Sequence, residues 1–403
     1  MSVQNPPEKL SAAAQGWLDF TRALGEAGLR VHELAARSLA KTPQQFGEVN
    51  EHMMHVLAAA VLMLPRIDPD CPEWFPALNS TMRCFNGNQD TVYTQTRIRG
   101  SGVYRVAGRR GTVKILLLQV FEGSFGFDDT SKVAAEINVD QCKIAPDGSF
   151  EIIFSAERPV GYSGDWVQIN GKIDNLYLIA RQVAEDWKTE IDAQLSVQRI
   201  DKDIDQPHWS QGEYDQRLRQ IPDYVERFAR SFMAIVERQH AQIPINGIKE
   251  VTQSLPTIVD QAYGHGIVEI ADDEVWIMEA ELLNKSAYWG VQIMDALGNT
   301  LDFMNHQCGL NAKQGKVDTD GRLRIVISRK DPGVANWIDK ADYDRVTVRT
   351  RFFDSAFPTT RTKVVPMADL WKHLPSDTPR VSPKERQAAL RARVEGAQWR
   401  RRW

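Results

Sequence analysis

Two short segments of the chain gather polar side chains of the kind that bind hydroxyl groups or hard cations. The first segment supplies Asn86, Asn88, Asp90 and Tyr93. The second supplies Asp302, Asn305, His306 and Asn311. Amide and carboxylate oxygens on loops beside a β-sheet can hold sugar hydroxyls or a cation such as calcium. The same residue types form turns by bonding to their own backbone, which is the competing and more common interpretation.

Paired carboxylates would suit glycoside hydrolysis, in which an acid and a base or nucleophile lie about 5 to 9 Å apart. The candidate acids are Asp90, Asp128, Asp129, Asp302 and Asp331. The predicted catalytic residues are Asp90, Asp302, Asp331 and, as a general base, His306. The predicted substrate-binding residues are Asn86, Asn88, Tyr93, Asn305, Asn336, Trp337 and Arg351. Solvated turn carboxylates are the alternative for each acid.

The common catalytic motifs are missing from the sequence. It contains no G-x-S-x-G, G-x-G-x-x-G or P-loop pattern, which disfavours the common serine hydrolases and nucleotide enzymes. His52 and His55 are one helical turn apart, but their apolar neighbours favour a packed helix over a metal site. We therefore predict no metal site, and the cofactor is unknown.

Composition narrows the class of protein further. The chain has 403 residues, of which 42% are hydrophobic and 25% charged, as in globular proteins of two or three domains. A net charge of -4 predicts no specific binding to nucleic acid. The four cysteines have no C-x-x-C spacing and no signal peptide is apparent, so we expect a cytoplasmic protein. The most apolar run, residues 56–64, is too short for a membrane span.

Periodicity predicts a mixed, β-dominated (α+β) fold. Helical spacing of apolar residues marks an N-terminal region, residues 1–74, and a connector, residues 206–250. Short alternating runs rich in Val, Ile, Tyr and Phe, separated by turn residues, predict antiparallel β-sandwiches at 75–205 and 251–365. The last segment, residues 366–403, reads as a basic tail helix that Ser382 and Glu385 cap.

The two β regions repeat one another. DGSFEIIFS begins at Asp147 and DGRLRIVIS begins at Asp320, and each is followed by a proline turn and a tryptophan. C-terminal to these strands, the alignment pairs Trp166 with Trp337 and Arg181 with Arg351. N-terminal to them, it pairs Val92-Tyr93 with Val275-Trp276 and Tyr104 with Tyr288. We interpret this as a duplicated sandwich, with the tryptophans capping the two cores and the arginines forming structural salt bridges.

The C-terminal copy, with LDFMNHQCGLN and DTDGRLRIVISRKDPGVANWID, resembles the domain-of-unknown-function family 1214. In the N-terminal copy, FNGNQDTVY resembles the Asn-Pro-Asp-Thr-x-Tyr element of the companion family 1254, with Gln89 in the place of proline. The resemblance covers roughly residues 75 to 360. It implies tandem jelly-roll-like sandwiches with helical insertions, and it implies no particular reaction.

Three functions remain open. The first is a hydrolase-type enzyme for a small polyhydroxy or glycoside-like molecule. The second is a noncatalytic ligand-binding or assembly module. The third is a catabolic enzyme for an apolar ring compound, since 11 tryptophans and 15 phenylalanines could line a dry pocket. All three functions predict that the partner is a small-molecule ligand or further copies of the chain in a homo-oligomer. Separately, we expect the basic tail to dock on an acidic surface of its own chain or of another subunit.

Overall fold

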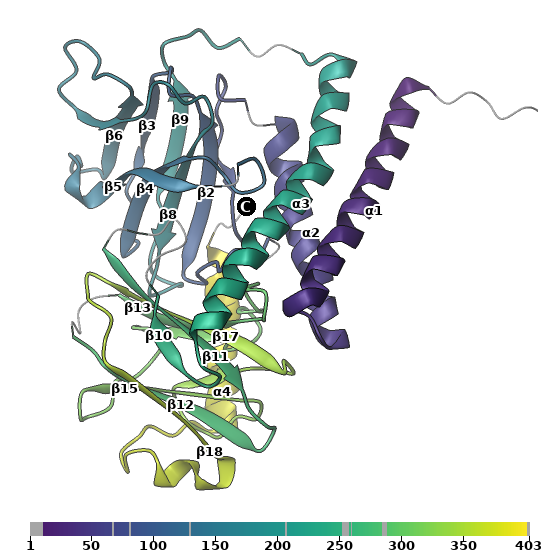
Figure 1. Cartoon of the computed structure of the whole chain (residues 1–403). Coiled ribbons are helices and arrows are strands. Elements are labelled where there is room, and N and C mark those ends of the chain that lie inside the picture. The colour runs from purple at the N-terminus through teal and green to yellow at the C-terminus, as the bar shows by residue number, and fades with distance from the viewer. Residues whose placement is uncertain are drawn as a thin grey trace, which may run out of the picture.

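The structure is a computed structural model that describes residues 11–66, 68–79, 82–128, 130–205, 208–251, 258, 260–283 and 288–400. Its long helices are α1 (Ala12–Ser38), α2 (Pro43–Arg66), α3 (Gln211–Gln242) and α4 (Pro383–Trp399), and its short 3-10 helices are η1 (Val139–Gln141) and η2 (Met367–Lys372). Figure 1 shows two β-rich bodies one above the other, with α1, α2 and α3 along one side. The predicted β-dominated α+β class is confirmed.

Two sheets form the first sandwich. The five-stranded sheet has the order β1-β2-β8-β4-β5 and the four-stranded sheet has the order β7-β6-β3-β9. The strands are β1 (Phe75–Pro76), β2 (Thr91–Ile98), β3 (Tyr104–Arg109), β4 (Ile115–Glu122), β5 (Lys132–Asn138), β6 (Ser149–Ser155), β7 (Asp165–Gln168), β8 (Leu176–Val183) and β9 (Gln194–Arg199).

The second sandwich has the same plan, with sheets β10-β11-β17-β13-β14 and β16-β15-β12-β18. Its strands are β10 (Ile248–Glu250), β11 (Gln261–Glu269), β12 (Glu274–Glu281), β13 (Trp289–Met294), β14 (Gly309–Asn311), β15 (Arg322–Ser328), β16 (Trp337–Asp339), β17 (Arg345–Phe353) and β18 (Thr360–Pro366). The strand pairs are antiparallel as predicted, except that β6–β7 and β15–β16 are parallel. In both cases a connecting loop returns the chain to the starting end of the first strand, so the edge strand runs in the same direction.

The strand orders correct part of the predicted repeat. The DG strands β6 and β15 occupy equivalent places, and so do the edge strands with Trp166 and Trp337. The upstream alignment is wrong by one strand, because β2 lies in a five-stranded sheet and β12 in a four-stranded one. Strand β2 instead corresponds to β11, which places Tyr93 in the position of Tyr263. Equal strand orders are what a duplication would produce, and we keep duplication as an interpretation.

The sandwich cores are formed by the inward-facing side chains of the central strands, which are every second residue of a strand. Leu116, Leu118 and Val120 of β4 pack inward against Ile152 and Phe154 of β6, and each is fully buried. Burial of such a side chain contributes about 1.5–3 kcal/mol. Both sheets of each sandwich supply residues of this kind, so the two cores hold the sheets face to face.

The two tryptophans are equivalent but do not cap the cores. The Trp166 indole donates to the Ser155 hydroxyl at 2.9 Å, and the Trp337 indole donates to the Ser328 hydroxyl at 3.0 Å. Trp337 packs with Val275 and Leu370 in a cluster separate from the inner core. It therefore lies on the outer face of its four-stranded sheet.

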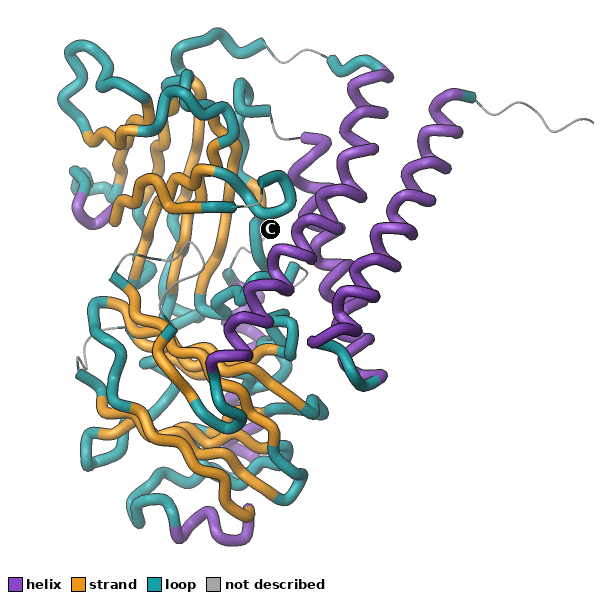
Figure 2. The backbone as a smooth tube through the Cα atoms, in the orientation of Figure 1, coloured by secondary structure: helices purple, strands orange, loops and turns teal. Residues whose placement is uncertain are grey.

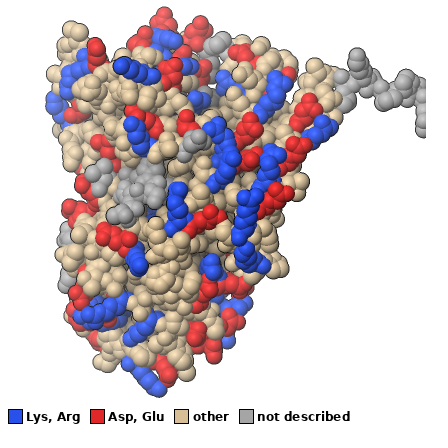
Figure 3. Space-filling model, viewed as in Figure 1, with Lys and Arg blue, Asp and Glu red and all other residues tan. Residues whose placement is uncertain are grey.

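Helices α2 and α3 cover the outer face of the first five-stranded sheet, and α1 packs against them from outside (Figure 2). In α3, Ile221, Val225, Phe228 and Phe232 repeat at helical spacing and are all buried. They pack with residues of α1 and α2 and with Phe121 of β4. Among the described residues, no helix is long and apolar enough to cross a membrane. On the face seen in Figure 3, basic and acidic side chains are interspersed.

The tail helix α4 docks on its own chain: it lies behind the second sandwich in Figure 1, and its C-terminal end reaches the first. Two buried arginines, Arg386 and Arg393, belong to the helix, and a third, Arg400, follows its last residue. They are spaced seven residues apart, so they share one face of the helix. Arg386 pairs with Asp331, Arg393 donates to Gln89 at 2.7 Å, and Arg400 pairs with Asp192 and donates to the Gln182 carbonyl. The helix thus ties the second sandwich to the first.

A buried acid pair joins α2 to the second sandwich. Glu48 accepts from the Ala296 amide at 3.3 Å, and Asp295 accepts from the Asn299 side chain at 2.7 Å. Burial, and then Asp295, raise the pKa of Glu48 to about 8. Burial raises the pKa of Asp295 to about 7. The pair therefore holds protons at a pH where the unfolded chain has released them.

This acid pair predicts stability that falls as pH rises. Both folded pKa values exceed the ordinary ones of 4.5 and 3.8, so the contribution is complete below about pH 4 and is lost toward about pH 8. Glu48→Gln keeps an acceptor for Ala296 and removes one titration. We expect the drop in melting temperature between about pH 5 and pH 8 to become smaller in this variant. The exposed Glu33→Gln is the control, and equal drops in the two variants would contradict the assignment.

The docking of α4 predicts that its buried arginines stabilise the fold. Arg393→Met removes the hydrogen bonds that Arg393 donates to Gln89 and to the Phe303 carbonyl, which should lower the free energy of unfolding by about 2 kcal/mol. Arg391→Met, at an exposed position on the same helix, should change it by less than about 0.5 kcal/mol. Denaturant titration of the two variants measures the difference, and a similar effect in both would refute a specific role for Arg393.

Candidate functional site

A cavity of about 170 Å³ lies between the two sandwiches and the helices. The first sandwich contributes the outer face of β2, β4 and β8, the second contributes β11 and β17, and α2 and α3 close the side. Strand β8 orders its lining: Arg181, opposite Tyr93, marks an end with arginine, tyrosine and amide side chains, and Tyr177, four residues away and opposite Phe121, marks an end with aromatic rings. The cavity is therefore amphipathic.

Three arginines line the polar end: Arg181 on β8, and Arg349 and Arg351 on β17. Alternation along β17 puts Arg349 and Arg351 on one face of the sheet. Each of these two residues is only 4% exposed. No carboxylate of the described residues lies within 4.0 Å of any of the three, so the structural salt bridges predicted at Arg181 and Arg351 are not found there.

The hydrogen bonds of these guanidinium groups are also incomplete. Arg351 donates one Nη2 bond to the Asn86 carbonyl at 2.6 Å, while its buried Nη1 has no partner among the described residues. The buried Nε of Arg181 likewise has none. Arg349 contacts the Tyr263 ring at 5.8 Å and makes no hydrogen bond with a residue that the structure describes. Donors therefore remain for an anion.

Electrostatics agree with this geometry. Burial, and then the neighbouring Arg351, lower the pKa of Arg349 to about 9. The group is still cationic at neutral pH. Burying a charge without a partner costs several kcal/mol, so proteins rarely leave one in that state without a functional reason. The polar end carries positive charge that nothing in the described protein neutralises.

Two tyrosines accompany the arginines at equivalent strand positions. Tyr93 stands opposite Arg181 in the β2–β8 pair, and Tyr263 stands opposite Arg351 in the β11–β17 pair. The Arg181 guanidinium lies 5.5 Å from the Tyr93 ring. Burial raises the pKa of Tyr263, although Arg181 and Arg351 oppose the rise. Neutral phenols can donate to an anion alongside the arginines.

Amide side chains at this end also lack partners. The buried side-chain nitrogen and oxygen of Asn86, and the side-chain oxygens of Gln239 and Gln261, have no hydrogen bond within the described chain. All three residues line the cavity. Buried polar atoms are nearly always bonded, so this concentration marks a place where a polar ligand or water binds.

The opposite end is built from aromatic side chains. The rings are those of Phe85, Phe121, Phe125, Tyr177, Tyr224 and Phe228. Phe85 lies 5.4 Å from Phe125 and 5.7 Å from Phe228, measured between ring centroids. Gly126 has a φ of +93°, and a Cβ there would approach the Tyr224 ring to 2.5 Å, so glycine is required for this packing.

Of the predicted site residues, Asn86, Tyr93 and Arg351 line the cavity. Asn88 lies beside them: its amide N–H donates to the Tyr93 hydroxyl at 3.0 Å, and its side chain donates to the Tyr288 hydroxyl at 2.9 Å.

Asp90 is enclosed rather than open to the cavity. Its carboxylate accepts from the Trp187 indole at 2.9 Å, the Asn311 side chain at 2.9 Å and the Tyr288 hydroxyl at 2.8 Å. The residue is 0% exposed. Burial raises the pKa of Asp90, while these donors and Arg393 oppose the rise. The geometry is that of a structural junction between the sandwiches.

The predicted residues near position 302 form a turn on the second sandwich. Asp302 accepts from the backbone and side chain of Asn305. Burial would raise the pKa of Asp302, but these hydrogen bonds outweigh it and the pKa is lowered. His306 is exposed and contacts Asp339 at 2.8 Å. None of these residues lines the cavity, and they behave as turn formers.

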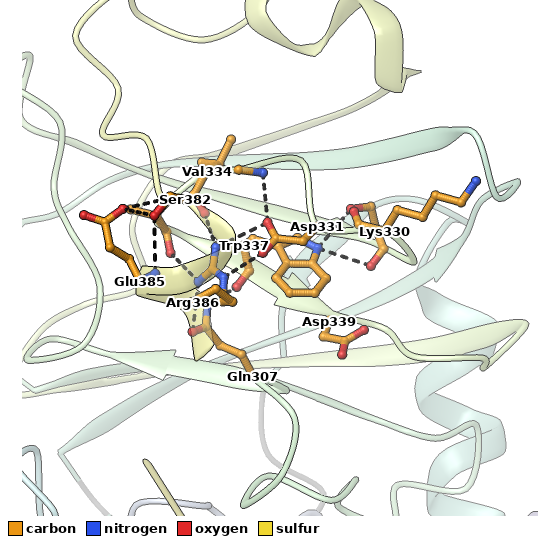
Figure 4. Close-up of polar contacts among 12 residues, drawn as sticks. Gln307, Lys330, Asp331, Val334, Trp337, Asp339, Ser382, Glu385 and Arg386 are labelled. Atoms are coloured by element: carbon orange, nitrogen blue, oxygen red, sulfur yellow. Dashed lines mark hydrogen bonds and ion pairs between the residues drawn. The ribbon is translucent and has the colours of Figure 1, made fainter. Parts of the chain in front are cut away.

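The residues from 331 to 337 are joined to α4, as Figure 4 shows. Asp331 pairs with Arg386 at 2.8 Å and accepts from the Gly333 amide at 2.8 Å. The Arg386 guanidinium also lies 5.2 Å from the Trp337 ring. Asn336 donates to the carbonyls of Lys316 and Arg324. These three predicted site residues hold a loop and a helix in place.

The remaining candidates add no second site. Asp128 accepts from the Ser124 amide and the Asn175 side chain, and Asp129 lies outside the described residues. His52 contacts Asn299 and His55 contacts Glu51, so the two histidines bond to different partners and do not form one site. Within the described ranges, no group of three His, Cys, Asp or Glu side chains could hold a metal ion.

Sequence reasoning missed Arg349, Tyr263, Gln261 and the aromatic wall. One signal was available in RVTVRTRFF, where arginines at 349 and 351 alternate with buried positions of a strand. Two arginines on one face of a strand that is buried on both faces require either counter-ions or a ligand. The aromatic wall had no comparable signal, because ordinary core phenylalanines look the same in sequence.

Comparisons with known proteins identify relatives without a described activity. Residues 276–357 match the model of a protein family of unknown function, DUF1214, which confirms the resemblance over that range. No family model matches the 1254-like segment. No curated protein matches the chain.

Solved structures extend the likeness to most of the chain. An uncharacterized protein from Burkholderia cenocepacia has a TM-score of 0.80 and 26% identity, over 88% of this chain and 97% of that chain. The VPA0106 protein from Vibrio parahaemolyticus has a TM-score of 0.46 and 10% identity, over 78% of this chain and 98% of that chain. The first of these supports the whole arrangement of sandwiches and helices.

Because Arg349 has no carboxylate partner among the described residues, we predict that its replacement by an apolar residue stabilises the fold. Arg349→Met removes a buried cation that has no carboxylate partner, so the unliganded protein should melt at least about 2 °C higher. Arg324→Met is the matched comparison, because Arg324 is equally buried but pairs with Asp318 and Glu279. That variant should lose about 3 kcal/mol, since it leaves a buried acid unpaired. Destabilisation of both variants to a similar degree would show that Arg349 is satisfied within the protein.

Proposed function

We propose that this protein binds a small organic anion in the cavity between its two sandwiches. The acid group of the ligand would lie among Arg181, Arg349 and Arg351, and its apolar body would lie against the aromatic wall. The observation that carries the proposal is the set of three cavity-lining arginines without a carboxylate partner in the described chain. An oxyanion would supply both the missing charge and the missing acceptors.

The proposal corresponds to a ligand-binding protein, the noncatalytic alternative among the functions considered. The glycoside-hydrolase alternative has less support, because the cavity has no Asp, Glu or His among its described lining residues. The predicted acids Asp90, Asp302 and Asp331 are each occupied in turns, junctions or ion pairs. The aromatic wall supports an apolar ligand body, as in the third alternative. A cytoplasmic location and a homo-oligomer stay predictions.

Binding of acids against their neutral amides tests this function. Isothermal titration calorimetry of the wild-type chain with a panel of monocarboxylic acids and the matching amides should give heats only for acids. Arg349→Met should weaken acid binding by about 10- to 100-fold, because this factor corresponds to the free energy of one hydrogen bond to a charged group. Its control is Arg345→Met on the same strand, because Arg345 pairs with Glu269 and does not line the cavity.

The proposed function is rejected if acids and amides bind alike. It is also rejected if Arg349→Met binds acids as tightly as the Arg345→Met control does. Circular dichroism of both variants shows whether the sheets are intact, so that a loss of binding is not confused with unfolding.

A further inference from the structure

We infer that the ligand is a carboxylic acid that carries one six-membered ring, with the ring against α2 and α3 and the carboxylate at β17. This inference rests on the proposed function and adds the size, shape and orientation of the ligand. Three observations carry it: the volume of the cavity, the separation of its polar and aromatic ends, and the pairing of the arginines.

The volume sets the size. The cavity has about 170 Å³. An apolar protein cavity of about 150 Å³ admits benzene, so this one holds a single ring with a short acidic substituent. The cavity is partly open, so two fused rings would have to extend past its lining residues or move the walls. The close contacts between Phe85, Phe125 and Phe228 leave these walls little freedom to do so.

The division of the walls sets the orientation. Tyr224 and Phe228 belong to α3 and Ala59 to α2, whereas Arg349 and Arg351 belong to β17 of the second sandwich. A ring gains from aromatic neighbours in edge or offset contacts, and an acid gains from the arginines. A ligand that places its ring at the helices and its acid at β17 satisfies both ends at once.

The arrangement of donors favours a planar carboxylate. Arg349 has its whole guanidinium available, and Arg351 retains Nη1 after its bond to the Asn86 carbonyl. A guanidinium group binds the two oxygens of a carboxylate or of a phosphate in the same bidentate way, and the planar carboxylate is the smaller head to fit beside a ring in about 170 Å³. Phenyl phosphate shares the ring and is also an oxyanion, but it has a tetrahedral head and a charge of about −1.5 to −2 at pH 7, so it separates the two oxyanion chemistries in an experiment.

Ala59 allows a matched test of the ring position. It is buried on α2 and lines the cavity. Ala59→Leu adds side-chain volume at the aromatic end and leaves the arginines unchanged. Val61→Leu, at an exposed position on the same helix, places the same new residue outside the cavity, although it adds less volume than Ala59→Leu.

Calorimetry with benzoate, cyclohexanecarboxylate, hexanoate, 2-naphthoate, acetate and phenyl phosphate measures the preference. We expect benzoate and cyclohexanecarboxylate to bind most tightly, and acetate to bind about 100-fold more weakly because it lacks a ring to bury. Phenyl phosphate should bind more weakly than benzoate. Ala59→Leu should lose benzoate binding and keep the weak acetate binding, while Val61→Leu keeps both.

The outcomes separate this inference from the proposed function. If hexanoate or 2-naphthoate binds as tightly as benzoate, or if Ala59→Leu binds benzoate normally, the ring assignment is wrong while anion binding stands. A phenyl phosphate preference overturns the carboxylate assignment in the same way. If no acid binds more tightly than its amide, the proposed function fails and this inference fails with it.

Discussion

The carboxylate of Asp90 is the contact on which the arrangement of the two sandwiches depends. Asp90 directly precedes β2 of the first sandwich, yet two of the three side-chain donors to its carboxylate, Tyr288 and Asn311, come from the second. Its backbone carbonyl also accepts from Arg400 of the tail helix. Because a buried carboxylate is costly unless fully bonded, this junction permits only one relative placement of the parts. That placement brings Tyr93, three residues along β2, to the cavity.

The chain uses buried arginine in two different ways. Arg386 and Arg400 pair with carboxylates, and Arg393 bonds to amide and carbonyl oxygens, so these three groups hold α4 in place. Arg349 has no such partner among the described residues, and Arg351 is only partly bonded. The contrast within one protein matters, because a fold able to satisfy buried guanidinium groups elsewhere leaves them available at the cavity. Proteins commonly keep such destabilising groups where a function needs them.

The helical layer explains why the cavity is amphipathic. Strand β8 places Tyr177, Ile179 and Arg181 on the outer face of the first sandwich. Alone, this face would be exposed to water. Helices α2 and α3 cover its apolar part with Met63, Tyr224 and Phe228, whereas β17 of the second sandwich covers its polar end. One side of the cavity consequently has an apolar lining and the other has a charged lining.

Local pattern in the sequence determined the elements of this protein. The alternation in DGSFEIIFS and DGRLRIVIS predicted β6 and β15, the 3 or 4 spacing from Ile221 to Phe232 predicted α3, and Ser382 with Glu385 predicted the start of α4. These features depend on neighbours within a few residues, which is why they can be read without a fold. Asn86, Tyr93 and Arg351 were found in the same way, as polar groups in strands and turns. Tertiary structure alone decided that Asp302 and Asp331 bond to Asn305 and Arg386 away from the cavity, and that β2 corresponds to β11. It also decided that Arg349 and Phe228 line one cavity, because charge compensation and enclosure depend on residues far apart in the chain.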